Sequence, residues 1–170
     1  MADSFQWSVL LKKKDPWVHI VVIPEAEMDA LVKTAPHDAG AVVRMVRGRN
    51  CAAAMDLFRE WGAALQFPSY FGENWDAFED CLLDLEWLPA KGYVIILTNA
   101  NHLLKNAPQE LHVFCDILNR AAEEWNGVVE EPGDSGRSPV PFHVVLHTLP
   151  DHEAETRARF VKAGLKLRRP

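Results

Sequence analysis

The chain has 170 residues, of which 48% are hydrophobic and 25% charged, and its formal net charge is −6. This length and composition suit one folded domain and exclude a fibrous or low-complexity chain. The acidic balance argues against general nucleic-acid binding, which needs a basic surface. No apolar run approaches the roughly 18 residues that a membrane-spanning helix needs, and the start of the chain lacks a signal-peptide pattern. We therefore expect a cytoplasmic protein with no membrane or nucleic-acid partner.

Short apolar runs and helical patterns alternate along the chain. The runs predict four buried strands, at Trp17–Ile23, Ala41–Val46, Tyr93–Thr98 and Val140–His147. The gaps between them predict helices at Glu25–Lys33, from an Asn50 cap to Leu65, at Trp75–Trp87, at Asn101–Lys105 (short), from Pro108 to about Trp125, and more weakly at Glu153–Ala163. Residues 127–139 predict a loop. Nearly continuous apolar strands separated by helices indicate an α/β fold, with a small parallel sheet of about four strands covered by helices.

The acidic residues are concentrated in one segment. Residues 60–90 hold seven Asp and Glu and no Lys, Arg or His, which leaves 17 acids against 18 Lys and Arg in the rest of the chain. Within this segment Asn74 is a good helix cap, and Asp76, Asp80 and Asp84 recur at the spacing of one helix face. Such like charges at i, i+4 cost an isolated helix a few tenths of a kcal/mol each. Three interpretations fit: a solvated face, a docking surface for a basic partner, or a divalent-metal or acid/base site.

A motif at the start of this helix is much more specific than the acidic stripe. The run Tyr70-Phe71-Gly72-Glu73-Asn74-Trp75-Asp76-Ala77, followed by Asp80-Cys81-Leu82, closely resembles the signature of the barstar family, intracellular inhibitors of the secreted ribonuclease barnase. The order of strands and helices on either side agrees. The resemblance covers about residues 41–147 and is strongest over 68–82.

The resemblance implies an inhibitor, not an enzyme, with a barstar-like layered fold and no cofactor. Members of the family plug the nuclease active site with the acidic helix and the loop before it. By position, Asp80 would take the place of a substrate phosphate and Asp76 would be a second interface aspartate. Tyr70 would pack on the enzyme, with Asn74 and Trp75 beside it. The implied partner is a secreted or toxin ribonuclease of barnase type, and the implied role is that of an immunity protein.

Two positions depart from the family pattern. Glu79 stands where the family has tryptophan, which removes an aromatic contact and adds a charge. On the later helix, Glu124 matches one interface glutamate of the family, whereas Arg120 stands at the other. These changes should alter which nuclease is bound. Our expected binding residues are Tyr70, Asn74, Trp75, Asp76, Glu79, Asp80 and Glu124.

We expect residues 1–170 to form a single domain with three parts. Residues 1–38 form an extension with an extra strand and helix, residues 41–149 a barstar-like core, and residues 150–170 a basic helix and tail. The resemblance explains neither flanking part. The sequence pattern sets no oligomeric state.

Other chemistry finds little support in the sequence. Cys51, Cys81 and Cys115 lie in apolar helical patterns and are expected to be buried free thiols. His143 and His147 share one side of a predicted strand but would lie about 13 Å apart, too far to chelate one ion. Two alternatives to the inhibitor remain: a scaffold with this fold that binds a non-nuclease basic partner, and a metal-dependent hydrolase using Asp76, Asp80 and Asp84.

Overall fold

The computed structural model describes residues 5–127 and 137–170. The helices are α1 (Trp7–Leu10), α2 (Glu25–Val32), α3 (Ala54–Ala64), α4 (Trp75–Asp84), α5 (Leu111–Asn126) and α6 (Glu153–Lys162). The strands are β1 (Val18–Val22), β2 (Ala41–Arg47), β3 (Gly92–Thr98), β4 (Phe142–Thr148) and β5 (Leu167–Arg168). Short 3-10 turns lie at His37–Ala39, Gly48–Asn50, Ala100–His102, Pro108–Glu110 and Pro150–His152.

The strands form one parallel sheet in the order β2-β3-β4-β1-β5. The predicted α/β fold with a parallel sheet is confirmed, although the sheet has five strands where we expected about four. The missed strand, β5, is only two residues long and pairs with Val18 and His19 of β1. Both strands outside residues 41–149 therefore join the sheet on the far side of β4 from β2 and β3.

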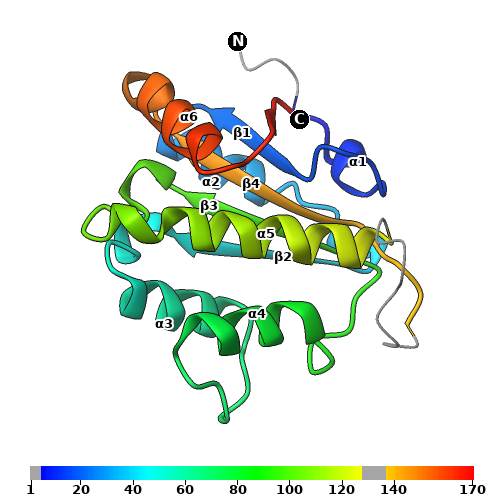
Figure 1. Ribbon diagram of the computed structural model, residues 1–170. Helices are drawn as coiled ribbons and strands as arrows, with labels where there is room; N and C mark the ends of the chain where they lie inside the picture. The colour runs from blue at the N-terminus through cyan, green and yellow to red at the C-terminus, as the bar shows by residue number, and fades with distance from the viewer. Residues whose placement is uncertain (1–4, 128–136) are drawn as a thin grey trace.

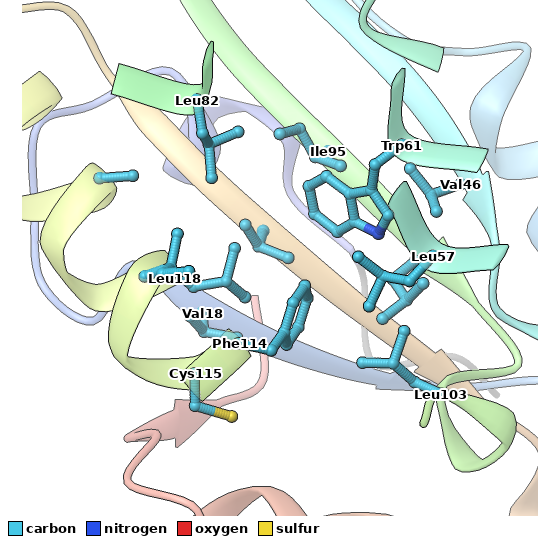
Figure 2. Packing of buried hydrophobic residues seen from close by; sticks show 14 of the residues in the cluster. Val18, Val46, Leu57, Trp61, Leu82, Ile95, Leu103, Phe114, Cys115 and Leu118 are labelled. Carbon is cyan, nitrogen blue, oxygen red and sulfur yellow. The ribbon is translucent and has the colours of Figure 1, made fainter. Parts of the chain in front are cut away.

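Helices cover both faces of the sheet. Helices α3, α4, α5 and α6 pack on one face, around a core that includes Trp61, Leu82, Ile95 and Phe114 (Figures 1 and 2). Helices α1 and α2 cover the other face, where Met28 is fully buried. Strands β3 and β4 are buried along their whole length, as their continuous apolar sequences predicted.

The start of α3 differs from the prediction. Asn50 does not cap this helix, because it lies in a 3-10 turn and its side-chain Nδ2 donates to Glu60 Oε2 at 3.2 Å. The helix begins at Ala54, and its cap residue, Ala53, makes no side-chain capping bond. The carboxylate of Glu60, one turn before the helix end, has drawn Asn50 into a bond that the local sequence pattern did not reveal.

Other helix boundaries also differ from the prediction. Helix α4 ends at Asp84 rather than Trp87, because Leu85 takes a left-handed conformation with φ 48°. The predicted short helix at 101–105 is a 3-10 turn followed by turns, and the long helix after Pro108 begins with a 3-10 turn. Most of the predicted loop at 127–139 lies outside the described residues. In the described part of the chain, no helix combines the length and apolarity that crossing a bilayer requires.

Candidate functional site

Asn74 fixes the start of the acidic helix α4, as predicted. Its Oδ1 accepts from the backbone N–H of Ala77 at 2.9 Å, and its Nδ2 donates to the carbonyl oxygen of Gly72 at 3.2 Å. A Cβ atom at Gly72 would lie 3.0 Å from that same Nδ2, so the absence of a side chain there leaves room for the cap. Between them Glu73 has a φ of 47°, in the left-handed region that costs a non-glycine residue about 1 kcal/mol or more.

The two faces of α4 separate as the helical spacing predicted. Phe78, Cys81 and Leu82 are buried, and Leu85 is buried just beyond the helix end. Asp76 and Asp80 are exposed, one turn apart on the outer face. Neither carboxylate forms an ion pair with any residue in the described ranges. Both are therefore free to meet cations from outside the chain.

The two aromatic residues of the motif differ in environment. Tyr70, in the loop before α4, is 72% exposed, whereas Trp75 is half-buried. The Trp75 ring packs edge-on against Phe58, with centroids 4.8 Å apart, and its Nε1 donates to Glu110 Oε2 at 2.7 Å. Tyr70 thus offers a free aromatic surface, while Trp75 mainly ties α4 to α3 and to the turn before α5.

Glu79 forms an ion pair with Arg120 of α5. The arginine side chain is 59% exposed and the glutamate 19%. The two positions that depart from the family pattern therefore contact each other. The acid on α4 is thus compensated by the base on α5.

Glu124 also has a basic partner within the chain. Arg137 Nη2 lies 3.4 Å from Glu124 Oε1, and its guanidinium stacks over the ring of Trp125, 3.7 Å from the centroid. Arg137 further donates to the carbonyl oxygens of Leu83 and Asp84, at the C-terminus of α4. A guanidinium there satisfies helix-end carbonyls and complements the dipole. Glu124 thus lies near the end of α4, with its charge already compensated.

Two further arginines neutralise acids of the segment over residues 60–90. Arg47 contacts Glu60 at 2.7 Å, and Arg59 contacts Glu73 at 3.3 Å. With Arg120 on Glu79, three of the seven acids are paired. The four without an ion pair in the described part of the chain are Asp76, Asp80, Asp84 and Glu86. The sequence could not reveal these pairs, because Arg47 and Arg120 approach from other elements.

Reduced hydration and nearby acids raise the pKa values of two neighbouring groups. Burial, assisted by the Asp80 and Asp84 carboxylates, raises the pKa of the Cys81 thiol to about 11, so this thiol stays neutral at pH 7. Loss of hydration and the Asp84 carboxylate raise the pKa of Tyr70, whose hydroxyl stays a hydrogen-bond donor. The three cysteines are free and buried, as predicted.

The three aspartates of α4 do not converge on one point. Among residues 5–127 and 137–170, no group of three or more His, Cys, Asp and Glu side chains lies close enough to hold a metal ion. His143 and His147 each bond elsewhere, the first to His19 and the second to the backbone of Asn99 and Ile23.

The structure is thus a parallel α/β sheet that presents an acidic helix on one face. A family model described as Barstar (barnase inhibitor) matches residues 41–147, the span that the sequence motif predicted. The chain belongs to the barstar family, whose description is that of an inhibitor rather than an enzyme.

Other comparisons add little. No curated protein matches the chain. Among solved structures, a chain from "Structure of Drosophila ORC bound to AT-rich DNA and Cdc6" is similar at 12% sequence identity with a TM-score of 0.49. The match covers 95% of this chain and 50% of that one, so this chain spans half of its length. At that level of similarity we infer nothing about function from it.

Proposed function

We propose that this protein is a cytoplasmic immunity protein that inhibits a secreted or toxin ribonuclease of barnase type. It binds through Tyr70, Asn74, Trp75, Asp76, Glu79, Asp80 and Glu124. The observation that carries the proposal is the pair of exposed, unpaired carboxylates of Asp76 and Asp80 in a chain of the barstar family.

The chemistry of a ribonuclease site suits these carboxylates. An enzyme that binds RNA phosphates carries cationic side chains, and carboxylates placed there form charge-assisted hydrogen bonds to them. Asp80 lies within the motif at the position that would replace a phosphate, and Asp76 lies one turn away. The acids without a partner extend the negative surface and should speed association with a basic enzyme.

The folded scaffold supports the division of the chain proposed from its sequence. We propose one domain, in which residues 41–149 are the binding core and residues 1–38 and 150–170 complete the sheet. Strand β1 pairs with β4 along five residues, and β5 pairs with β1. The acidic helix belongs to the core and packs on α5, on the side of the sheet away from α1 and α2 (Figure 1).

Titration of the purified protein into a barnase-type ribonuclease assay tests this function. We expect stoichiometric inhibition, and Asp80→Asn should weaken it at least tenfold, because a hydrogen bond between charged groups contributes about 1.5–3 kcal/mol. The matched control is Asp116→Ala, which removes an exposed aspartate from α5 on the side that faces Gly164.

Either result decides the proposal. Inhibition that Asp80→Asn weakens and Asp116→Ala leaves intact would support both the function and the site. Absence of inhibition across ribonucleases of this type would instead favour a non-nuclease basic partner for the same surface.

A further inference from the structure

A polar cavity lies at the edge of the sheet remote from β2. It has a volume of about 350 Å³ and is lined by α1, the segment between α1 and β1, the start of β1, and the chain from Arg168 of β5 onward. Lys12, Lys14, His19, Arg168 and Arg169 are among the residues that line it. Figure 1 shows this region around the C-terminus, on the opposite side of the molecule from α4. The cavity is therefore separate from the proposed inhibitory surface.

The cavity is strongly basic in a chain whose net charge is −6. Four of its lining residues are Lys or Arg, and Asp15 is its one acidic lining residue in the described part of the chain. Arg169 is partly neutralised by Glu153, at 3.1 Å. Lys12, Lys14 and Arg168 form no ion pair within the described ranges. Their three positive charges remain available to an anion.

His19, which lines the same cavity, has an unpartnered acceptor. His143 Nε2 lies 2.7 Å from the carbonyl oxygen of Lys12, which can only accept, so Nε2 carries the proton of that ring. His143 Nδ1 is then the acceptor for His19 Nε2, 3.0 Å away, and the His19 proton must lie on Nε2. The lone pair of His19 Nδ1 is left over, and it has no partner among the described residues.

The ring of His19 stays neutral. Burial, together with the nearby His143 and Arg168, lowers the pKa of His19 to about 3. His19 is only 1% exposed, so its lone pair is also hidden from bulk water. A buried acceptor without a donor destabilises the protein, and a ligand that supplies a donor removes this cost. The cavity therefore combines cations for an anionic group with an acceptor for an O–H or N–H group.

We propose that this cavity binds a small phosphate monoester that carries a free hydroxyl, such as a sugar phosphate. The phosphate contacts Lys14 and Arg168, and a sugar hydroxyl donates to His19 Nδ1. The volume suits a ligand of this size and is too small for a polynucleotide. This site does not depend on the proposed inhibition of a ribonuclease.

Calorimetric titration with three probes tests the proposal: ribose 5-phosphate, inorganic phosphate and ribose. We expect ribose 5-phosphate to bind at least about tenfold more tightly than inorganic phosphate, because only the sugar phosphate satisfies His19. Ribose alone should not bind measurably. Equal affinities for the first two probes would refute the hydroxyl contact, and no binding of either would refute the site.

Two further measurements separate this site from general attraction to basic residues. The double variant Lys14→Ala/Arg168→Ala should lose at least about tenfold in affinity, since both lost contacts are charge-assisted. The control Lys105→Ala/Lys162→Ala removes the same charge outside the cavity and should bind as the unmodified protein does. The imidazole ¹⁵N resonance of His19 Nδ1 should shift with ribose 5-phosphate and not with phosphate. Equal losses in both double variants, or an unmoved resonance, would overturn the proposal.

Discussion

Asn74→Ala should destabilise the protein by removing the cap of α4. The substitution removes the acceptor of the 2.9 Å bond from Ala77 N–H and the donor of the 3.2 Å bond to Gly72. Loss of a side-chain cap costs about 0.5–2 kcal/mol. The second bond is exposed to solvent and adds little. We therefore expect a loss of about 1–2 kcal/mol, which corresponds to about 2–8 °C in Tm for a domain of this size.

Urea unfolding followed by tryptophan fluorescence measures this loss. Asn74→Asp keeps the capping oxygen and adds a negative charge that favours the helix N-terminus, so it should remain within about 0.5 kcal/mol of the unmodified protein. The control Asn106→Ala removes an exposed asparagine amide that lies outside α4. Equal stability of Asn74→Ala and the unmodified protein would refute the capping argument.

The same pair of variants separates capping from partner contact. Inhibition that survives Asn74→Asp would show that the Asn74 amide acts by holding α4 and the loop before it in place. An Asn74→Asp protein that is stable and yet inhibits much more weakly would show that the amide itself touches the nuclease.

Three further predictions concern charge, pH and packing. Arg120→Ala should speed association with a cationic ribonuclease at low salt, because it leaves the Glu79 carboxylate uncompensated; an unchanged rate in stopped-flow mixing would contradict this. Lowering the pH from about 7 to about 5 should reduce the free energy of unfolding, measured by urea titration. The loss is up to about 1.4 kcal/mol per pH unit for each histidine that the folded protein holds neutral. The reason is that folding lowers the pKa of His19 from 6.5 to about 3, so only the unfolded chain takes up the proton in this range; a flat profile would show that the histidine is not held neutral. Gly48→Ala should cost about 1–3 kcal/mol or prevent folding, whereas Gly62→Ala in α3 should be neutral or stabilising by thermal melts. A Cβ atom at Gly48 would lie 2.4 Å and 2.6 Å from two backbone oxygens at the end of β3, while at Gly62 the nearest atom is 3.5 Å away; similar melts for the two variants would contradict this geometry.

The strands were predictable because each is a buried apolar run bounded by turn-forming residues. All four predicted strands appear within two residues of their expected ends. Strand β5 was not predictable, because Leu167–Arg168 has no apolar pattern and becomes a strand only by pairing with β1. The cap at Asn50 failed for a related reason, since Asn50 lies in a 3-10 turn and its Nδ2 donates to the distant carboxylate of Glu60.

The core and outer faces of α4 were predictable from helical spacing, because one turn of helix fixes which residues share a side. The charge that this surface presents could not be predicted in the same way. The sequence shows seven acids with no Lys, Arg or His among them. In the structure three of these acids form ion pairs with arginines, and two of those arginines come from β2 and α5. An ion pair between elements depends on how they pack, which the sequence order of charges does not contain.

The pair between Glu79 and Arg120 bears on selectivity, if the proposed function holds. A surface of carboxylates alone would attract many cationic sites, and its affinity would distinguish poorly between them. The Arg120 guanidinium, 59% exposed beside Glu79, opposes any enzyme that presents a base at that point. It favours an enzyme with an acidic or polar group there instead.

Arg120→Glu should therefore widen the range of ribonucleases that are inhibited. It places two acids at the former ion pair, so its stability must be measured alongside. A variant that folds but inhibits the same enzymes with the same affinities would show that this pair has no part in partner choice.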